Sequence, residues 1–105
     1  MPQFDVHRNI GATKAAYPYV VVLQSSLFRD RARWVVIPLA PATPDLPRND
    51  RLNPIFDLEG RRYGLATLAI FNLPKEQLGP VVANLTAESD TIIAAVDWMM
   101  SRGWG

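Results

Sequence analysis

The chain has 105 residues, a length that fits one folded domain, residues 1–105, with a modest core. Its hydrophobic fraction of 49% and charged fraction of 20% exclude a disordered chain. A net charge of +1 provides no general attraction to nucleic acid, and the absence of cysteine excludes disulfides, thiolate nucleophiles and thiolate metal sites.

Two short strands are predicted in the first quarter of the chain. Polar and apolar residues alternate over residues 3–7, which is typical of a half-buried strand. Residues 9–16 contain small side chains and are expected to form a loop. Residues 17–24 are rich in β-branched and aromatic side chains, so we expect a strand that is buried on both faces. Pro18 is expected near the start of this strand, because proline has no N–H to donate to a sheet.

The strongest strand signal covers residues 33–40, after a charged loop at residues 25–32. Pro38 lies inside this segment, which predicts either a bulge or the point at which the strand leaves the sheet. Residues 41–50 contain three prolines and are expected to form an irregular loop.

A hairpin is predicted in the middle of the chain, from residues 52–58 and 62–71. Gly60 supplies the positive φ that its turn needs. Gly64 predicts a bulge or a close backbone approach in the second strand. Residues 72–74, Asn-Leu-Pro, are expected to end that strand, and one more short strand is expected at residues 76–78 before the segment that leads to the C-terminal helix.

Residues 86–105 are predicted to form the only long helix, with Thr86 as its N-cap and Gly103 just past its end. Steps of ~100° per residue place five apolar side chains on one broad face. They are Ile92, Ile93, Val96, Met99 and Met100. Short sequential strands followed by one helix predict a mainly β protein, an antiparallel barrel or meander that the helix closes.

The end of this helix is the candidate contact surface. Trp98 is expected at the flank of the apolar face, and Trp104 stands close to the last residue, where few neighbours can bury it. Aromatic rings in such positions can anchor a partner protein. The structural alternatives are that Trp98 covers the rim of the core and that Trp104 belongs to a frayed end without function.

Motifs for catalysis and cofactor binding are absent from the sequence. None of the glycine spacings of phosphate or dinucleotide loops occurs, and His7 is the only histidine, so a pair of histidines cannot bind a metal. Asp57 and Glu59 flank a turn and are interpreted as turn residues rather than an acid–base pair. No apolar run approaches the ~18–20 residues of a membrane span, and the first residues lack a signal-peptide pattern, so we expect a cytoplasmic protein.

Five segments of the sequence are informative together: MPQFDVH (residues 1–7), YVVVLQS (19–25), RWVVIPLA (33–40), NPIF (53–56) and VANL (82–85). In their order and spacing they resemble the CcdB family of toxins over nearly the full length of the chain. The helix follows them. The VIPLA segment, residues 36–40, is the most specific of these matches.

The resemblance implies a small SH3-like antiparallel barrel with one C-terminal α-helix, the fold that CcdB and MazF/Kid toxins share, and a homodimer. It implies the toxin half of a toxin–antitoxin pair, which binds the A subunit of DNA gyrase and traps the cleaved gyrase–DNA complex. Such a toxin is a protein inhibitor and not an enzyme. A CcdA-like antitoxin neutralises it, and neither a cofactor nor direct sequence-specific nucleic-acid binding is implied.

The resemblance also implies contact residues, because the family touches gyrase through a Trp-Gly-Ile tripeptide after the helix. The corresponding candidates here are Trp98, Met100, Ser101, Arg102, Gly103, Trp104 and Gly105. Ser101 stands where the family has its tryptophan, and Trp104 and Gly105 come three residues later without the isoleucine. Either the tip is extended by one turn, ~5 Å, and Trp104 makes the same contact, or the gyrase contact is altered or lost. The antitoxin is expected to contact the loops around Phe28 and Leu46 and the helix end at Trp104.

Two alternative functions remain open. The first is a homologue that binds its antitoxin but has weakened or lost activity on gyrase. The second is an endoribonuclease of the MazF type, which would need a basic groove and a general acid or base from Arg29, Arg31, Arg33 or His7. The near-neutral net charge and the missing constellation of a carboxylate with an arginine count against the ribonuclease.

Overall fold

A computed structural model describes residues 3–25, 27, 32–43 and 49–102 of the chain, without the side chain of Arg102. The strands are β1 (Asp5–Asn9), β2 (Tyr19–Val22), β3 (Arg33–Pro41), β4 (Ile55–Leu58), β5 (Arg61–Leu65), β6 (Phe71–Pro74) and β7 (Leu78–Asn84). The helical elements that lie wholly within the described residues are the short 3-10 turns η2 (Thr67–Ala69), η3 (Lys75–Gln77) and η4 (Thr86–Glu88) and the α-helix α1 (Ser89–Arg102).

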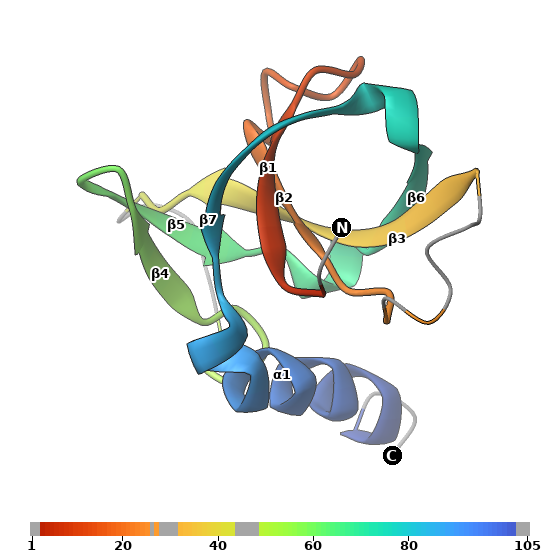
Figure 1. Cartoon of the computed structure of the whole chain (residues 1–105). Coiled ribbons are helices and arrows are strands. Elements are labelled where there is room, and N and C mark those ends of the chain that lie inside the picture. Colours follow the sequence, from red (N-terminus) through yellow and green to blue (C-terminus); the bar gives the residue numbers. More distant parts are fainter. Residues whose placement is uncertain (1–2, 26, 28–31, 44–48, 103–105) are drawn as a thin grey trace.

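All strands pair antiparallel in one curled sheet, in the order β4-β5-β3-β2-β1-β7, with β6 beside the first half of β3. Figure 1 shows that β1, β2, β3, β6 and β7 bend around a common centre and that α1 lies against the outside of this half-barrel. The β4–β5 hairpin extends to one side of it. The predicted mainly β, barrel-like fold with one C-terminal helix is confirmed.

Pro38 marks the point at which β3 changes its neighbour on one edge. Residues 33–36 of β3 pair with β6 and residues 39–41 pair with β5, so Pro38 falls between the two ladders. On the other edge Pro38 pairs with Val20 in regular register, without a bulge. Its carbonyl oxygen accepts a hydrogen bond of 2.9 Å from the N–H of Ala66. A residue without an N–H fits this gap, because neither ladder needs a donor there.

The second strand of the hairpin ends earlier than predicted. Residues 62–71 do not form one strand, because the chain turns through η2 after Leu65 and begins β6 at Phe71. The hydroxyl of Thr67, which is fully buried, donates to the carbonyl oxygen of Leu52 and fixes this turn. Asn72–Pro74 therefore belongs to β6 rather than ending a strand, and residues 76–78 form no separate strand, because η3 covers most of them.

The turn of the β4–β5 hairpin is confirmed, and its conformation involves two residues. Gly60 has φ of 80° and Glu59 has φ of 51°, so both central positions are left-handed, as a two-residue hairpin turn requires. The bulge or close approach predicted at Gly64 is wrong. Gly64 pairs in regular register with Ala40 and Ile55, and a Cβ at this position would meet no atom within 4 Å.

The hydrophobic side chains form two clusters on the two faces of the sheet. We call the first the helix-side core; it contains Phe4, Val6, Tyr19, Val21, Ile37, Leu39, Phe56, Leu58, Tyr63, Leu65, Leu85, Ile92 and Ala95. We call the second the barrel core; it contains Val20, Val22, Trp34, Val36, Leu73 and Leu78. Residues of β2 alternate between the two clusters, so this strand is buried on both faces, as its apolar run predicts.

The C-terminal helix begins later than predicted and buries a narrower face. It is preceded by the 3-10 turn η4, whose N-cap is Leu85, so Thr86 is not the N-cap. The N–H of Thr86 donates a hydrogen bond of 2.9 Å to Oδ1 of Asn84. Ile92 is fully buried, and Val96 and Met99 are partly buried. Ile93 is 45% exposed and Met100 is 68% exposed, so the broad apolar face predicted for the helix is only partly covered by the sheet.

Ionisation of Tyr19 makes the stability of the fold depend on pH in the alkaline range. Its side chain is largely buried, its hydroxyl donates to Oε2 of Glu59 at 3.1 Å, and its ring meets the Tyr63 ring edge-on with the centroids 5.1 Å apart. Burial, and then the hydrogen bond to Glu59, raise the pKa of Tyr19 above its ordinary 10.0. The folded chain therefore holds this proton more tightly than the unfolded chain, and the free energy of unfolding decreases as the pH rises above about 10.

We expect Tyr19→Phe to reduce this alkaline loss of stability, because phenylalanine has no proton to release. Urea unfolding at pH 8 and above pH 10 measures the effect, with Tyr17→Phe, at a partly buried tyrosine, as the control. An alkaline loss of the same size in wild type and Tyr19→Phe would contradict the assignment.

Candidate partner-binding site

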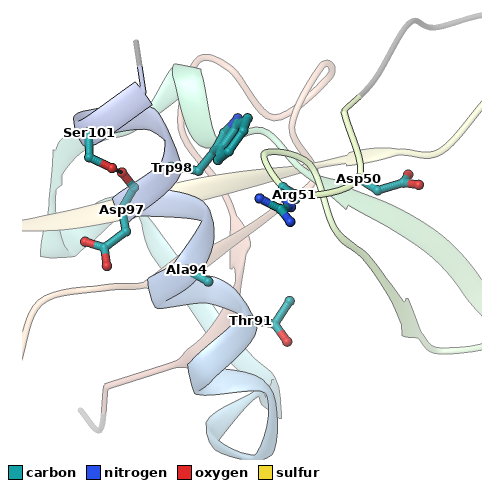
Figure 2. A pocket seen from close by; sticks show the side chains of 7 residues that line it. All are labelled: Asp50, Arg51, Thr91, Ala94, Asp97, Trp98 and Ser101. Carbon is teal, nitrogen blue, oxygen red and sulfur yellow. Dashed lines mark hydrogen bonds between the residues drawn. The ribbon is translucent and has the colours of Figure 1, made fainter. Parts of the chain in front are cut away.

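An open groove of about 460 Å³ lies between α1 and the turn that precedes β4. Figure 2 shows the side chains that line it, five from one flank of the helix and two from the facing turn. They are Thr91, Ala94, Asp97, Trp98, Ser101, Asp50 and Arg51. We call this feature the α1 groove.

Trp98 forms the aromatic wall of the α1 groove. Its ring is partly buried, and the guanidinium carbon of Arg51 lies 5.1 Å from the ring centroid. An arginine in this position is attracted to the face of the indole and fixes the ring against the turn. The structure thus places Trp98 at the flank of the helix, as predicted, and adds Arg51, a partner 47 residues earlier that no sequence spacing indicates.

The floor of the groove consists of small side chains. Thr91, Ala94 and Ser101 recur at intervals of three and seven residues, which places them on one face of α1. The hydroxyl of Ser101 donates at 2.6 Å to the backbone carbonyl of Asp97 within the helix. The floor therefore offers little side-chain bulk, and another backbone can approach closely.

The structure brings only some of the predicted contact residues together. Trp98 and Ser101 line the same groove, whereas Met100 is exposed on a different flank of α1. The helix reaches Arg102. The candidates Gly103, Trp104, Gly105, Phe28 and Leu46 lie outside the described residues.

Of the residues considered for ribonuclease chemistry, the structure describes His7 and Arg33, and one is buried while the other is exposed. His7 is almost fully buried, and its Nδ1 lies 2.9 Å from the carbonyl oxygen of Gly79. Arg33 is exposed and bonds through Nε to Oδ1 of Asn72, while Arg29 and Arg31 lie outside the described residues. Within the described part of the chain, no group of three or more His, Cys, Asp or Glu residues could hold a metal ion.

A carboxylate and an arginine form an ion pair at the β4–β5 turn. Nη2 of Arg8 lies 3.4 Å from Oε2 of Glu59, and Tyr19 donates to the same oxygen. Both charged side chains are about half exposed, and they neutralise each other. This arrangement connects the β4–β5 turn to β1 and β2. It could not be predicted from the sequence, because Arg8 and Glu59 are 51 positions apart.

The described helices include none that is long and apolar enough to cross a membrane. The curled sheet and the closing helix define the class of small antiparallel half-barrels with one C-terminal α-helix. The family model described as CcdB protein matches residues 3–102, and the chain therefore belongs to the CcdB family. The family identifies it as a toxin of a toxin–antitoxin pair, a class that is not a known enzyme. A search of curated proteins finds no match to the chain.

Proposed function

We propose that this protein binds the A subunit of DNA gyrase, inhibits it and traps the cleaved gyrase–DNA complex. Membership of the CcdB family over residues 3–102 is the observation that carries the proposal. The toxin acts in the cytoplasm as a homodimer of a single 105-residue domain, without a cofactor, and a CcdA-like antitoxin neutralises it.

The gyrase contact is the end of α1 and the residues that follow it. It comprises Trp98, Met100, Ser101, Arg102, Gly103, Trp104 and Gly105. The exposure of Met100 and the partial exposure of Trp98 support this choice, since large apolar side chains at a surface are the usual anchors of a protein interface. Trp104 is the principal anchor, and the glycines on either side of it allow its partner to approach the backbone closely.

The homodimer is supported by apolar side chains that the monomer leaves uncovered. Ile93 lies on α1 and is 45% exposed. Leu68 is 71% exposed on η2, which packs against α1. A second copy related by a two-fold axis can cover such a surface with the same surface of its own. The antitoxin contacts Phe28 and Leu46 in their loops and Trp104 at the helix end.

Deleting Trp104 and Gly105, or replacing Trp104 with alanine, is expected to abolish trapping of cleaved DNA, because the anchor side chain is lost. The measurement is a gyrase supercoiling and cleavage assay with purified dimer. We expect Trp104→Phe to retain part of the activity and Gln77→Ala, at an exposed residue of η3, to retain all of it. A truncated chain that still traps cleaved DNA would show that the tip is not the contact.

The second candidate function is an antitoxin-binding homologue without activity on gyrase. It is favoured by Ser101, which stands at the position of the family tryptophan and offers a hydroxyl, already bonded to Asp97, instead of an aromatic ring. Failure of the intact dimer to inhibit gyrase at saturating concentration, together with binding of the antitoxin, would support it. Sequence-dependent cuts in purified RNA would instead favour the ribonuclease.

A further inference from the structure

We propose that Asp5 and Asn84 are positioning residues for α1. Their side-chain hydrogen bond, together with the backbone of Phe4, fixes the start of the helix and thereby the place of its other end. The inference rests on the proposed function, because it takes the end of α1 as the gyrase contact. All three residues lie near the start of the helix rather than among the proposed contact residues, so they act through α1.

The side chains of Asp5 and Asn84 connect β1 to the segment that leads into the helix. The two residues stand directly opposite each other in the antiparallel pairing of β1 with β7. Nδ2 of Asn84 donates a hydrogen bond of 2.7 Å to Oδ1 of Asp5, which is buried. A hydrogen bond to a carboxylate is stronger than one between neutral groups, and a buried carboxylate needs such a partner. Oδ1 of Asn84 accepts from the N–H of Thr86 at 2.9 Å, so one side chain links β1 to the first residue of η4.

Phe4 adds a backbone link in an unusual conformation. Its φ is 68°, in the left-handed region that a bulky residue seldom adopts. Its N–H donates to the carbonyl oxygen of Val22 at 2.7 Å, and its own carbonyl oxygen accepts from the N–H of Leu85 at 2.8 Å. Its buried ring belongs to the helix-side core, as do Leu85 and Ile92. Backbone strain of this kind persists only where the surrounding contacts impose it, and it clusters at functional positions.

The direction of α1 at its start decides where the contact end lies. β7 leads through η4 into α1, which continues for 14 residues (Figure 1). The helix is therefore ~20 Å long, and a tilt of about 10° at its start moves the other end by roughly 3–4 Å. The buried side chains of α1, Ile92 and Ala95, are apolar, and apolar burial has no preferred direction. The hydrogen bonds at the start of the helix are directional, so they oppose the tilt more strongly.

The test exchanges the two side chains and measures inhibition of purified gyrase. Asn84→Asp places a second carboxylate opposite Asp5, which replaces the hydrogen bond with repulsion but keeps an acceptor for the N–H of Thr86. We expect inhibition to weaken by at least about fivefold, since a loosened α1 must be ordered on binding. The double variant Asp5→Asn/Asn84→Asp has an amide at position 5 and a carboxylate at position 84, so the hydrogen bond returns in the reverse direction at unchanged net charge. It is expected to inhibit within about twofold of wild type.

Asn9→Asp is the matched control, because it makes the same chemical change at the other end of β1. Nδ2 of Asn9 donates at 2.9 Å to Oγ1 of Thr13 and at 2.9 Å to the carbonyl oxygen of Tyr17, and both bonds are lost. This variant is expected to be less stable but to inhibit gyrase, per folded molecule, within about twofold of wild type. Circular dichroism verifies that each variant is folded under the assay conditions.

Hydrogen exchange provides a second measurement that does not need gyrase. The amides of residues 92–101 in α1 are expected to exchange faster in Asn84→Asp than in wild type, because local opening of the helix becomes easier. The double variant is expected to restore the wild-type rates, and Asn9→Asp is expected to leave the rates in α1 unchanged.

The outcomes separate the inference from the function on which it rests. If wild-type protein does not inhibit gyrase, the proposed function fails, and unchanged exchange of α1 in Asn84→Asp then overturns the inference on its own. If wild type and Asn84→Asp inhibit gyrase equally well, the inference is overturned. It is also overturned if the double variant is as weak as Asn84→Asp, or if Asn9→Asp loses as much inhibition as Asn84→Asp.

Discussion

Ile92→Ala is expected to lower the free energy of unfolding by about 3–4 kcal/mol, within the range for large-to-small changes in a core. Ile92 is fully buried and is the largest side chain that α1 contributes to the helix-side core. The substitution removes buried apolar surface and leaves a cavity between the helix and the sheet. Chemical denaturation followed by circular dichroism measures the change.

The matched control is Ile10→Ala, which removes the same atoms from a side chain that is 54% exposed. Its cost is expected to stay below about 1 kcal/mol, as for other partly exposed positions. Equal losses at Ile92 and Ile10 would contradict the view that α1 is held to the barrel by buried contacts.

Gly79→Ala is expected to cost about 2–3 kcal/mol, because overpacking at a rigid contact forces the backbone to move. A Cβ at Gly79 would lie 2.9 Å from the carbonyl oxygen of Arg8 and 3.1 Å from Cγ2 of Ile10. The pairing of β1 with β7 also shifts register between His7 and Asn9, next to this contact. Movement of Gly79 would also strain the hydrogen bond from His7 to its carbonyl oxygen.

Gly64→Ala is the natural comparison, since it adds the same methyl group at a second strand glycine. A Cβ at Gly64 meets no atom within 4 Å, so the expected change is between zero and a gain of about 1 kcal/mol. Thermal unfolding of both variants measures the contrast. A larger loss at Gly64 than at Gly79 would refute the explanation by close approach.

The strands and the tight turn were largely predictable because their signals are local. The apolar run of β2 and the left-handed glycine of the β4–β5 turn each depend on neighbouring residues alone. The 3-10 turns η2 and η3 were not predictable, since the first is fixed by the contact of Thr67 with Leu52, 15 residues away. The N-terminus of α1 was misplaced for a similar reason: Asn84, at the end of β7, supplies the oxygen that bonds to Thr86.

In the candidate site, too, features with a local signal were predictable and features that depend on distant contacts were not. Trp98 could be assigned to the flank of the helix from its angular position, because that position depends only on helical geometry. Arg51 could not be assigned, since the fold alone brings the turn before β4 to α1. The extent of the apolar face was also overestimated: periodicity places Ile93 and Met100 next to buried residues, but it does not say how wide a strip the sheet covers.

The alternation of β2 between the helix-side core and the barrel core has a consequence for partial opening of the molecule. Val20 and Val22 face one cluster, and Tyr19 and Val21 face the other, so β2 is part of the wall between two compartments. Detachment of α1 would uncover only the compartment that contains Ile92, while the barrel core stayed closed on the opposite face. We therefore expect two levels of local stability, with the end of α1, the proposed gyrase contact, in the level that opens first.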